Sequence, residues 1–248
     1  MNNTILTLPK RPSKPRQYGI TAIMDMGLSL TQQQHILESY SGLVDLAKLG
    51  TGAAYINPVL KEKISLYQEF GVHVCLGGTL FEKYFKQRKI TAYKQFLIDL
   101  DLQWVEISSG ILDIPQQQLL DIAADFQQDF SVVVEVGKKF RPLGSEKWLA
   151  DIQRYLVAGV DYIILEGRST ADAGIYDSNG MLNQLLINKI STNIDINKLW
   201  FETATEKAQV QLIQSFGSNV NLSNIDPHDL VGLEALRVGL RAETFNIG

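Results

Sequence analysis

The hydrophobic positions of this chain fall into short runs rich in β-branched residues, which alternate with longer amphipathic stretches. Eight of the runs have the length and composition of strands, at residues 18–25, 43–50, 72–78, 104–110, 131–137, 162–167, 199–204 and 219–224. Several end in glycine, which suits a strand that passes directly into a tight loop. The pattern predicts strand and helix in alternation along the chain.

The stretches between the runs place apolar residues at helical spacing. Clear examples are LTQQQHILESYSG (30–42), DIPQQQLLDIAADFQQDF (113–130) and VGLEALRVGLRAETF (231–245). In the second, we expect Asp113 to be the N-cap, with Pro115 near the first helical position. The third is predicted to be the final helix.

Eight strands that alternate with helices, without a break in composition, predict a (β/α)8 barrel. The chain has 248 residues, which is a usual length for such a barrel as one domain. A doubly wound open sheet is the alternative, and it is disfavoured because no GxGxxG or P-loop motif follows the first run. We therefore expect an N-terminal extension over residues 1–17 and a single barrel over residues 18–248.

Composition narrows the functional classes. The chain is 45% hydrophobic and 20% charged with a net charge of -4, which fits one sizeable core and gives no sign of a nucleic-acid or membrane surface. Residues 1–17 are polar and basic and lack the apolar segment of a signal peptide or membrane helix. Cys75 is the sole cysteine, which excludes an internal disulfide and a cysteine-cluster zinc site. We expect a soluble, cytoplasmic protein.

Four glutamates follow apolar residues at corresponding points of four consecutive predicted strands. They are Glu106 in WVE, Glu135 in VVVE, Glu166 in IILE and Glu202 in WFE. Because the carboxyl ends of barrel strands meet at one mouth, we expect these side chains to gather there, together with Asp25 from the first strand. A single glutamate in such a place is usually a local ion-pair partner. Four together repel one another and require cations.

Basic residues occur at the same predicted strand ends, namely Lys48, Lys138, Lys139 and Arg168. Their positive charges roughly balance the negative charges of the five acids. A divalent metal ion would add positive charge and so favour the binding of anions at the mouth. Carboxylate ligation without a cysteine or histidine cluster favours Mg²⁺ over zinc or copper. We assign structural roles to His35, His73 and His228, which fall on a helix, at a strand start and in a loop.

Small and amide-bearing residues supply candidate anion donors. Gly77, Gly78 and Thr79 close the third run and open a helix, whose N-terminal amides suit phosphate or carboxylate, although GGT alone is equally typical of an ordinary turn. Hydroxyl and amide donors on neighbouring rims are Ser108, Asn221 and Asn224. The loops after late barrel strands often hold phosphate.

Several longer motifs resemble one known family. They are GGTLFEKY (77–84), EISSG (106–110), EVGKK (135–139), LEGR (165–168), DINKLWFE (195–202), NVNLSNI (219–225) and LEALRVGLRAETF (233–245). In this order they resemble the phosphosulfolactate synthase family over nearly the whole chain. The resemblance implies a (β/α)8 barrel and a Mg²⁺-dependent lyase. Its archaeal members add sulfite to phosphoenolpyruvate in a route of sulfonate metabolism that leads to coenzyme M. A trimer is also implied.

The resemblance assigns roles to residues. Lys139 matches the lysine of the family's EVG-x-K motif and becomes the candidate general acid, while Lys138 becomes a rim charge. The catalytic candidates are Lys139, Lys48 and Asp25; the substrate-binding candidates are Arg168, Gly78, Thr79, Ser108, Asn221 and Asn224; the metal candidates are Glu106, Glu135, Glu166 and Glu202.

Some loops differ from the family pattern. Thr51, Ala53 and Ala54 replace an aromatic and two hydroxyl residues, and further changes are Ser169, Thr203, Ala204 and Phe140. Three interpretations therefore stay open. The chain is a phosphosulfolactate synthase, a related Mg²⁺-dependent barrel enzyme acting on another small anionic enol or acid, or a non-catalytic, stress-associated homologue.

Overall fold

The structure is a computed structural model that describes residues 5–50, 52–167 and 173–247. Within these residues, eight parallel strands form one sheet: β1 (Thr21–Asp25), β2 (Leu46–Leu49), β3 (His73–Leu76), β4 (Trp104–Ile107), β5 (Ser131–Val136), β6 (Tyr162–Leu165), β7 (Leu199–Glu202) and β8 (Leu222–Ile225). Their order is β3-β2-β1-β8-β7-β6-β5-β4, so β3 and β4 are the two ends of the hydrogen-bonded ladder. Each predicted strand run overlaps one of these strands, and β8 extends one residue beyond its predicted run.

The two ends of the ladder lie together and make the sheet a near-closed barrel. The ring of His73 on β3 packs 5.5 Å from that of Trp104 on β4, centroid to centroid. The amide of Gly78, just after β3, donates a 2.7 Å hydrogen bond to Glu106 on β4. The (β/α)8 barrel is thus confirmed over the doubly wound open sheet.

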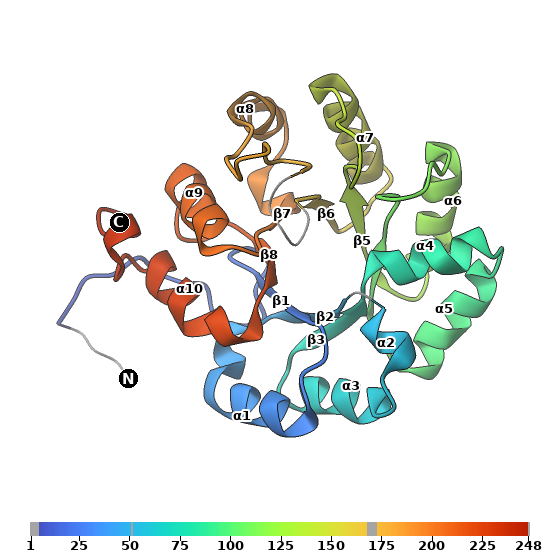
Figure 1. Cartoon of the computed structure of the whole chain (residues 1–248), viewed down its shortest axis with the longest axis horizontal. Coiled ribbons are helices and arrows are strands. Elements are labelled where there is room, and N and C mark those ends of the chain that lie inside the picture. The colour runs from blue at the N-terminus through green and yellow to red at the C-terminus, as the bar shows by residue number, and fades with distance from the viewer. Residues whose placement is uncertain (1–4, 51, 168–172, 248) are drawn as a thin grey trace.

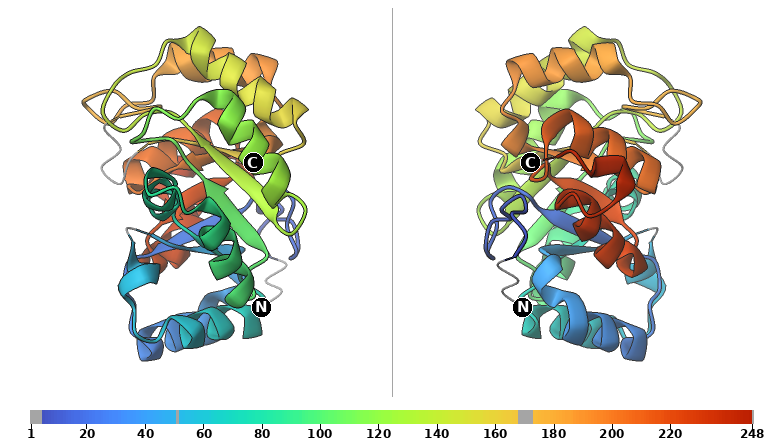
Figure 2. Two further views of the ribbon diagram at one scale, coloured as in Figure 1. Left: turned by 90° about the vertical axis from the view of Figure 1, so that its right-hand side faces the viewer. Right: turned by 90° about the vertical axis from the view of Figure 1, so that its left-hand side faces the viewer.

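Helices surround the strands as an outer layer (Figure 1), and Figure 2 shows α1 and α3 on one side of the barrel and α7 and α8 on the opposite side. The helices are α1 (Leu30–Tyr40), α2 (Ala53–Ile56), α3 (Leu60–Glu69), α4 (Gly78–Lys86), α5 (Ile90–Asp99), α6 (Gln116–Phe126), α7 (Ser145–Val157), α8 (Gln184–Asn193), α9 (Glu206–Phe216) and α10 (Leu230–Arg237). In the described part of the chain, no helix combines the length and apolar character needed to span a membrane.

Two predicted helix boundaries are wrong for local reasons. Helix α6 has Pro115 as its N-cap, and Asp113 instead pairs with Lys138, whose Nζ lies 3.3 Å from its carboxylate. The final helix ends at Arg237, because Gly239 adopts a left-handed φ of 72° that terminates the helix. Residues up to 245 were predicted as helical and instead form a turn and a short 3₁₀ helix (Ala242–Thr244).

Strand residues alternate between the barrel interior and the surrounding helices, which positions the acids. A buried interior layer contains Val133, Ile164 and Trp200, separate from the larger core between strands and helices. Two residues further along the same strands come the three glutamates Glu135, Glu166 and Glu202. Because strand side chains repeat with period two, each glutamate continues the interior face one layer nearer the carboxyl end.

The amino end of the barrel is closed by aromatic side chains and by the N-terminal segment. The rings of Trp104 and Tyr162 stack against Trp200 with centroids 5.9 and 5.0 Å away. Residues 5–17 contain no helix or strand, and Arg16 in this segment pairs with Asp45 at 3.0 Å. The interior therefore opens toward the carboxyl ends of the strands.

Candidate active site at the carboxyl end of the barrel

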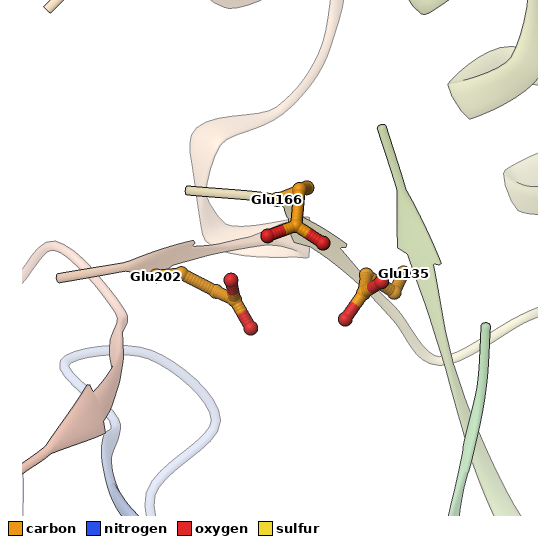
Figure 3. A group of neighbouring side chains, drawn as sticks. All are labelled: Glu135, Glu166 and Glu202. Atoms are coloured by element: carbon orange, nitrogen blue, oxygen red, sulfur yellow. The ribbon is translucent and has the colours of Figure 1, made fainter. Parts of the chain in front are cut away.

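Three buried carboxylates converge at the carboxyl end of the barrel. Glu135 lies in β5, Glu166 directly follows β6, and Glu202 ends β7. One carboxylate oxygen from each lies within 4.8 Å of the others, and Figure 3 shows the three side chains pointing toward a common centre. Their exposures are 4%, 0% and 2%. We call Glu135, Glu166 and Glu202 the acidic triad.

Lys48 links the triad to the fourth glutamate of the mouth. Its Nζ lies 3.0 Å from Glu106 Oε2 and 3.2 Å from Glu202 Oε1. Burial of Lys48 disfavours the ammonium, but the carboxylates of Glu106 and Glu202 outweigh this and raise its pKa. Lys48 is therefore a fixed, buried positive charge.

Lys139 occupies the other side of the triad. Its Nζ donates a 2.7 Å hydrogen bond to Glu166 and lies 3.4 Å from Glu135. Burial again opposes the charge, and the carboxylates of Glu135 and Glu166 again raise the pKa of the lysine. The side chain keeps 20% of its surface exposed, so its ammonium faces the cavity described below.

The described residues of the mouth carry more acid than base. Four glutamates face two lysines, so complete ionisation leaves an excess of two negative charges. Burial raises the pKa of Glu166, and the carboxylates of Glu135 and Glu202 raise it further. Burial would also raise the pKa of Glu202, but the two lysines and the Gly167 amide lower it to about 2. The excess matches the charge of one divalent cation.

A small cavity opens above these charges. Its volume is about 180 Å³, and its lining residues are Met24, Lys48, Gly50, Gly77, Gly78, Thr79, Glu106, Glu135, Lys139, Glu202 and Asn224. Ligand pockets for drug-sized molecules usually exceed about 300 Å³. This cavity therefore suits a small, charged ligand.

The predicted anion-binding glycines reach the cavity, but one of their amides is already used. The Gly78 amide donates to Glu106, so it holds a carboxylate of the protein. A Cβ added at Gly78 would lie 2.7 Å from Glu106 Oε1 and 2.4 Å from Ser108 Cβ. This close approach explains the glycine. Thr79 is exposed at the cavity edge.

Asn224 also lines the cavity, as predicted for a substrate-binding residue. Its backbone is left-handed, with φ 60°, and its side chain is 5% exposed. Its Oδ1 is buried without a hydrogen-bond partner in the described part of the chain. A left-handed asparagine with an unpaired amide oxygen is costly, and such positions concentrate at functional sites.

The structure does not bring Asp25 into this cluster. Its carboxylate accepts a hydrogen bond from Tyr67 at 2.9 Å and pairs with the buried Lys63 at 2.6 Å, both on α3. It also accepts the amides of Gly27 and Leu28. These contacts join β1 to α3 on the outside of the barrel, and we therefore leave Asp25 out of the proposed chemistry below.

Asn221 lies at the opposite end of the barrel from the cavity. It precedes β8, and its amide donates to the carbonyls of Asn197 and Leu199, while its oxygen accepts the amide of Ile20. Every one of these partners is backbone, which gives Asn221 a structural position. Arg168 lies outside the described residues, as do Thr51, Ser169 and Thr170.

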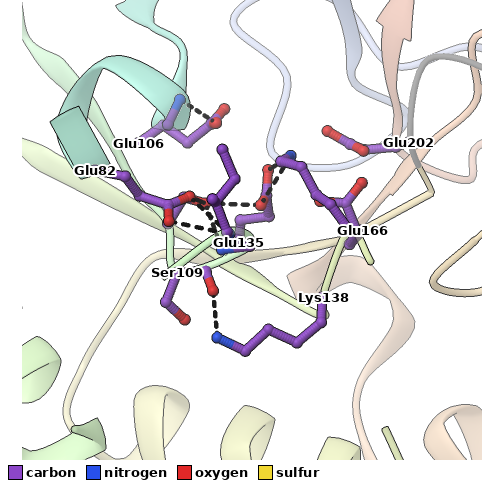
Figure 4. A network of polar contacts seen from close by, with 12 residues as sticks. Glu82, Glu106, Ser109, Glu135, Lys138, Glu166 and Glu202 are labelled. Atoms are coloured by element: carbon purple, nitrogen blue, oxygen red, sulfur yellow. Dashed lines mark hydrogen bonds and ion pairs between the residues drawn. The ribbon is translucent and has the colours of Figure 1, made fainter. Parts of the chain in front are cut away.

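Ser108 and Lys138 support the site from behind. Ser108 is buried, and its Oγ lies 2.7 Å from Glu135 Oε1. Lys138 donates to the carbonyls of Ser109 and Leu112, and Figure 4 shows it extending away from Glu166 and Glu202. This agrees with the prediction that Lys138 and Lys139 have different roles.

The histidines lie elsewhere. His35 is exposed on α1, His73 packs on Trp104 at the amino end, and His228 hydrogen-bonds Asp226 on the surface. The group of described side chains with metal-site spacing contains glutamates alone.

Sequence reasoning missed Glu82. This residue of α4 is 3% exposed and lies behind Ser108. It follows Gly78 by four positions, and helical periodicity places residues four apart on one face. That spacing was the available signal, because Gly78 was already assigned to the mouth.

Two of the described departures from the family pattern lie away from the cavity lining. Ala54 packs in the core between strands and helices. Thr203 is fully buried, and its amide and hydroxyl both donate to the Ser223 carbonyl at 2.8 and 3.2 Å. Neither residue removes a donor from the cavity.

The family model for (2R)-phospho-3-sulfolactate synthase (ComA) matches residues 9–243, which is nearly the whole chain. The chain belongs to the phosphosulfolactate synthase family. The strands that carry the acidic triad, and Lys48 and Lys139, all lie within the matched region.

Relatives in this family are similar end to end. The phosphosulfolactate synthase of Bacillus subtilis is 38% identical over 99% of both chains. That of Methanocaldococcus jannaschii is 35% identical over 92% of this chain and 94% of its own. Among solved structures, 3-hexulose-6-phosphate synthase from Salmonella typhimurium aligns with a TM-score of 0.54 at 14% identity, over 91% of this chain and 92% of that one. This last likeness shows the barrel fold alone.

Proposed function

We propose that this protein catalyses the addition of sulfite to phosphoenolpyruvate to give (2R)-phospho-3-sulfolactate. The observation that carries the proposal is the acidic triad flanked by Lys48 and Lys139 at the mouth of a family barrel. The family match supports the same reaction, and the end-to-end similarity to phosphosulfolactate synthases supports it further.

The residues present fit a Mg²⁺ ion. The donors are carboxylate oxygens, which this ion prefers, and the excess of two negative charges provides the balancing charge. Glu135, Glu166 and Glu202 would hold the ion. When bound, it supplies positive charge beside the substrate carboxylate, where negative charge develops during the reaction.

The proposed reaction forms two bonds and opens one π bond. The sulfur lone pair of sulfite attacks the methylene carbon C3 of phosphoenolpyruvate. The C2–C3 π electrons move toward C2 and are delocalised into the carboxylate as an enolate. A proton is then delivered to C2, which completes the product without loss of the phosphate.

Lys139 is the group we assign to this proton transfer. Its Nζ reaches the cavity, is protonated near neutral pH, and lies between two carboxylates that fix its direction. Those carboxylates raise the pKa of the lysine, and a general acid works best when its pKa is close to the operating pH. A cation held by Glu135 and Glu166 would weaken this effect, which would make Lys139 a stronger acid.

The anionic groups of the substrates need positive partners and donors. Lys48 forms part of the cavity lining and is protonated, so we assign it to binding substrate anions. The amide side chain of Asn224 offers a neutral contact in the same cavity. Thr79 adds a hydroxyl at the edge. Arg168 remains a proposed substrate ligand from the family motif.

A direct assay tests the function. Purified protein is incubated with phosphoenolpyruvate, sulfite and Mg²⁺, and phosphosulfolactate is sought by mass spectrometry, with a reaction lacking sulfite as control. We expect product to form with Mg²⁺ and not to form when EDTA is present.

Other outcomes of that assay identify the alternatives. Absence of product from protein that binds Mg²⁺ at the triad would favour a related barrel enzyme for another small anionic enol. Absence of both would favour the non-catalytic homologue. Buried, mutually repelling carboxylates are costly, and a scaffold without chemistry has no use for them.

A further inference from the structure

Glu82 is a buried acid that the proposed reaction does not use. It lies on α4, and its carboxylate faces the loop that follows β4. Glu82 accepts the amides of Ile111 at 3.0 Å and Leu112 at 2.6 Å. Its Oε1 lies 2.9 Å from the hydroxyl of Ser108. A buried carboxylate with three hydrogen-bond donors from one loop is well suited to fix that loop in one conformation.

Ser108 connects this carboxylate to the acidic triad. The same hydroxyl lies 2.7 Å from Glu135 Oε1, so Ser108 stands between Glu82 and a proposed metal ligand. A hydroxyl carries one hydrogen. When Ser108 donates it to Glu135, Glu82 still fixes the loop through the amides of Ile111 and Leu112, and the Gly110 amide of that loop donates to Ser108 Oγ at 3.1 Å, which keeps the hydroxyl in place.

The loop fixed by Glu82 is also the wall behind Glu135 and Lys139. The carbonyl of Gly110 accepts the Lys139 amide at 3.0 Å. A Cβ added at Gly110 would lie 2.8 Å from Glu135 Oε1 and 2.9 Å from Lys139 Cε. A small displacement of residues 108–112 therefore moves the two groups that the proposed reaction depends on.

We propose that Glu82 is a positioning residue, which sets the direction of the Glu135 carboxylate through Ser108 and the loop 108–112. The inference rests on the proposed function, because it takes the triad as the cation site. Hydrogen bonds to a ligating carboxylate orient it for the ion, and their loss typically weakens metal affinity about 10-fold or more.

The test measures Mn²⁺ binding to the full chain by electron paramagnetic resonance, with Mn²⁺ as a probe for the Mg²⁺ site. Glu82→Gln and Ser108→Ala are each expected to weaken Mn²⁺ binding about 10-fold. The double variant is expected to bind no more weakly than the worse single variant, because both changes break the same connection. Glu62→Gln, an exposed glutamate on α3, is the matched control and should bind like wild type.

Each result decides something. Wild-type Mn²⁺ affinity in Glu82→Gln overturns the inference, and so do single-variant effects that multiply in the double variant, since Glu82 would then act independently of Ser108. If Glu82→Gln does not fold, Ser108→Ala decides alone, with wild-type affinity counting against the inference. Failure of the proposed function looks different, because no phosphosulfolactate would then form in the assay described above, whatever the Mn²⁺ affinities. A wild-type chain that binds no Mn²⁺, or a Glu202→Gln variant that binds it equally well, would instead show that the triad is not the cation site and would overturn the inference.

Discussion

Arg237 and Lys48 are both buried cations, at the two opposite ends of the barrel, with very different partners. At the amino end, the Arg237 guanidinium donates to the carbonyls of Ser218, Val220 and Ile20 at 2.7, 2.7 and 3.1 Å. At the carboxyl end, Lys48 lies between two carboxylates that repel each other.

The difference shows what each charge is for. Neutral carbonyls accept hydrogen bonds from the two terminal nitrogens of Arg237, whose Nε has no partner among the described residues. These bonds tie the segment just before β1 to the segment before β8, which serves stability. Carboxylates at the mouth bring like charges together, which costs stability and is typical of a functional site, as proposed above for a cation and an anionic substrate. Variants at the two ends should therefore separate turnover from folding.

The largest effect is expected at the mouth. Lys139→Ala should lower turnover per folded molecule by about 10²- to 10⁴-fold, the usual contribution of a general acid. It also removes the cation paired with the buried Glu166, so a loss in the free energy of unfolding is expected beside it. Steady-state assays and urea unfolding measure the two quantities. Lys147→Ala is the matched control, because its ammonium pairs with Asp151 on the exposed surface of α7, and it should keep near-normal turnover. Near-normal turnover in Lys139→Ala would remove the general-acid assignment.

Arg237→Met should show the reverse. Three buried carbonyls lose their donor, and we expect the free energy of unfolding to fall by about 3 kcal/mol or more. Turnover per folded molecule should remain within about twofold of wild type, because the cavity lies at the other end. Arg241→Met, which removes a partly exposed arginine, is the control for stability. A stable Arg237→Met protein with impaired turnover would break the separation of the two ends.

Cation binding should counteract a loss of stability that occurs as the pH rises. Burial and neighbouring acids raise the pKa of Glu166 in the folded state above its value in the unfolded state. The stability that Glu166 contributes is therefore fully present below the unfolded pKa and is lost as the pH rises through the folded pKa. Without divalent cation, wild-type stability should therefore fall over this range, and less so in Glu166→Gln. Mg²⁺ at 100 times its dissociation constant should add about 2.7 kcal/mol to wild type. Thermal unfolding with Mg²⁺ or with EDTA at several pH values measures both; an equal Mg²⁺ effect in Glu166→Gln would exclude Glu166 as a ligand.

The smallest effect is expected at Phe140. Its side chain is 76% exposed beside Lys139 but does not line the cavity above the triad. Phe140→Ser should change the free energy of unfolding by less than about 0.5 kcal/mol and leave the Michaelis constant for phosphoenolpyruvate nearly unchanged. A several-fold change in that constant would place Phe140 in contact with substrate and extend the mouth toward α7.

The fold and the acidic triad were predictable because both depend on periodicity. Alternation of strand and helix predicted the barrel, and the matching positions of the glutamates at the ends of consecutive strands placed Glu135, Glu166 and Glu202 at its mouth. Asp25 was predicted to lie at the mouth, but side chains alternate along β1, and Asp25 falls on the face that points toward the helices. Its partners Lys63 and Tyr67 come from a helix some forty residues away, and strand pattern carries no information about that contact.

The supporting contacts were harder to predict for the same reason. Glu82 lies on a helix, and its role depends on a loop whose backbone amides have no signature in sequence. Asn221 and Asn224 look equivalent in NVNLSN, yet they lie at opposite ends of β8. Asn221 precedes β8 and Asn224 is the third of its four residues, so two residues separate an asparagine that binds backbone from one that lines the cavity.

The hydrogen bond from Gly78 to Glu106 has a consequence for how this family can diverge. It spans the place where β3 and β4 meet without ladder pairing, so Glu106 fastens the barrel wall as well as neutralising Lys48. A descendant that lost the reaction would be free to replace the triad but would still need an acid at position 106 and a glycine at position 78. Sequences that keep this pair while varying at 135, 166 and 202 are therefore expected to belong to branches that retain the barrel without the proposed reaction.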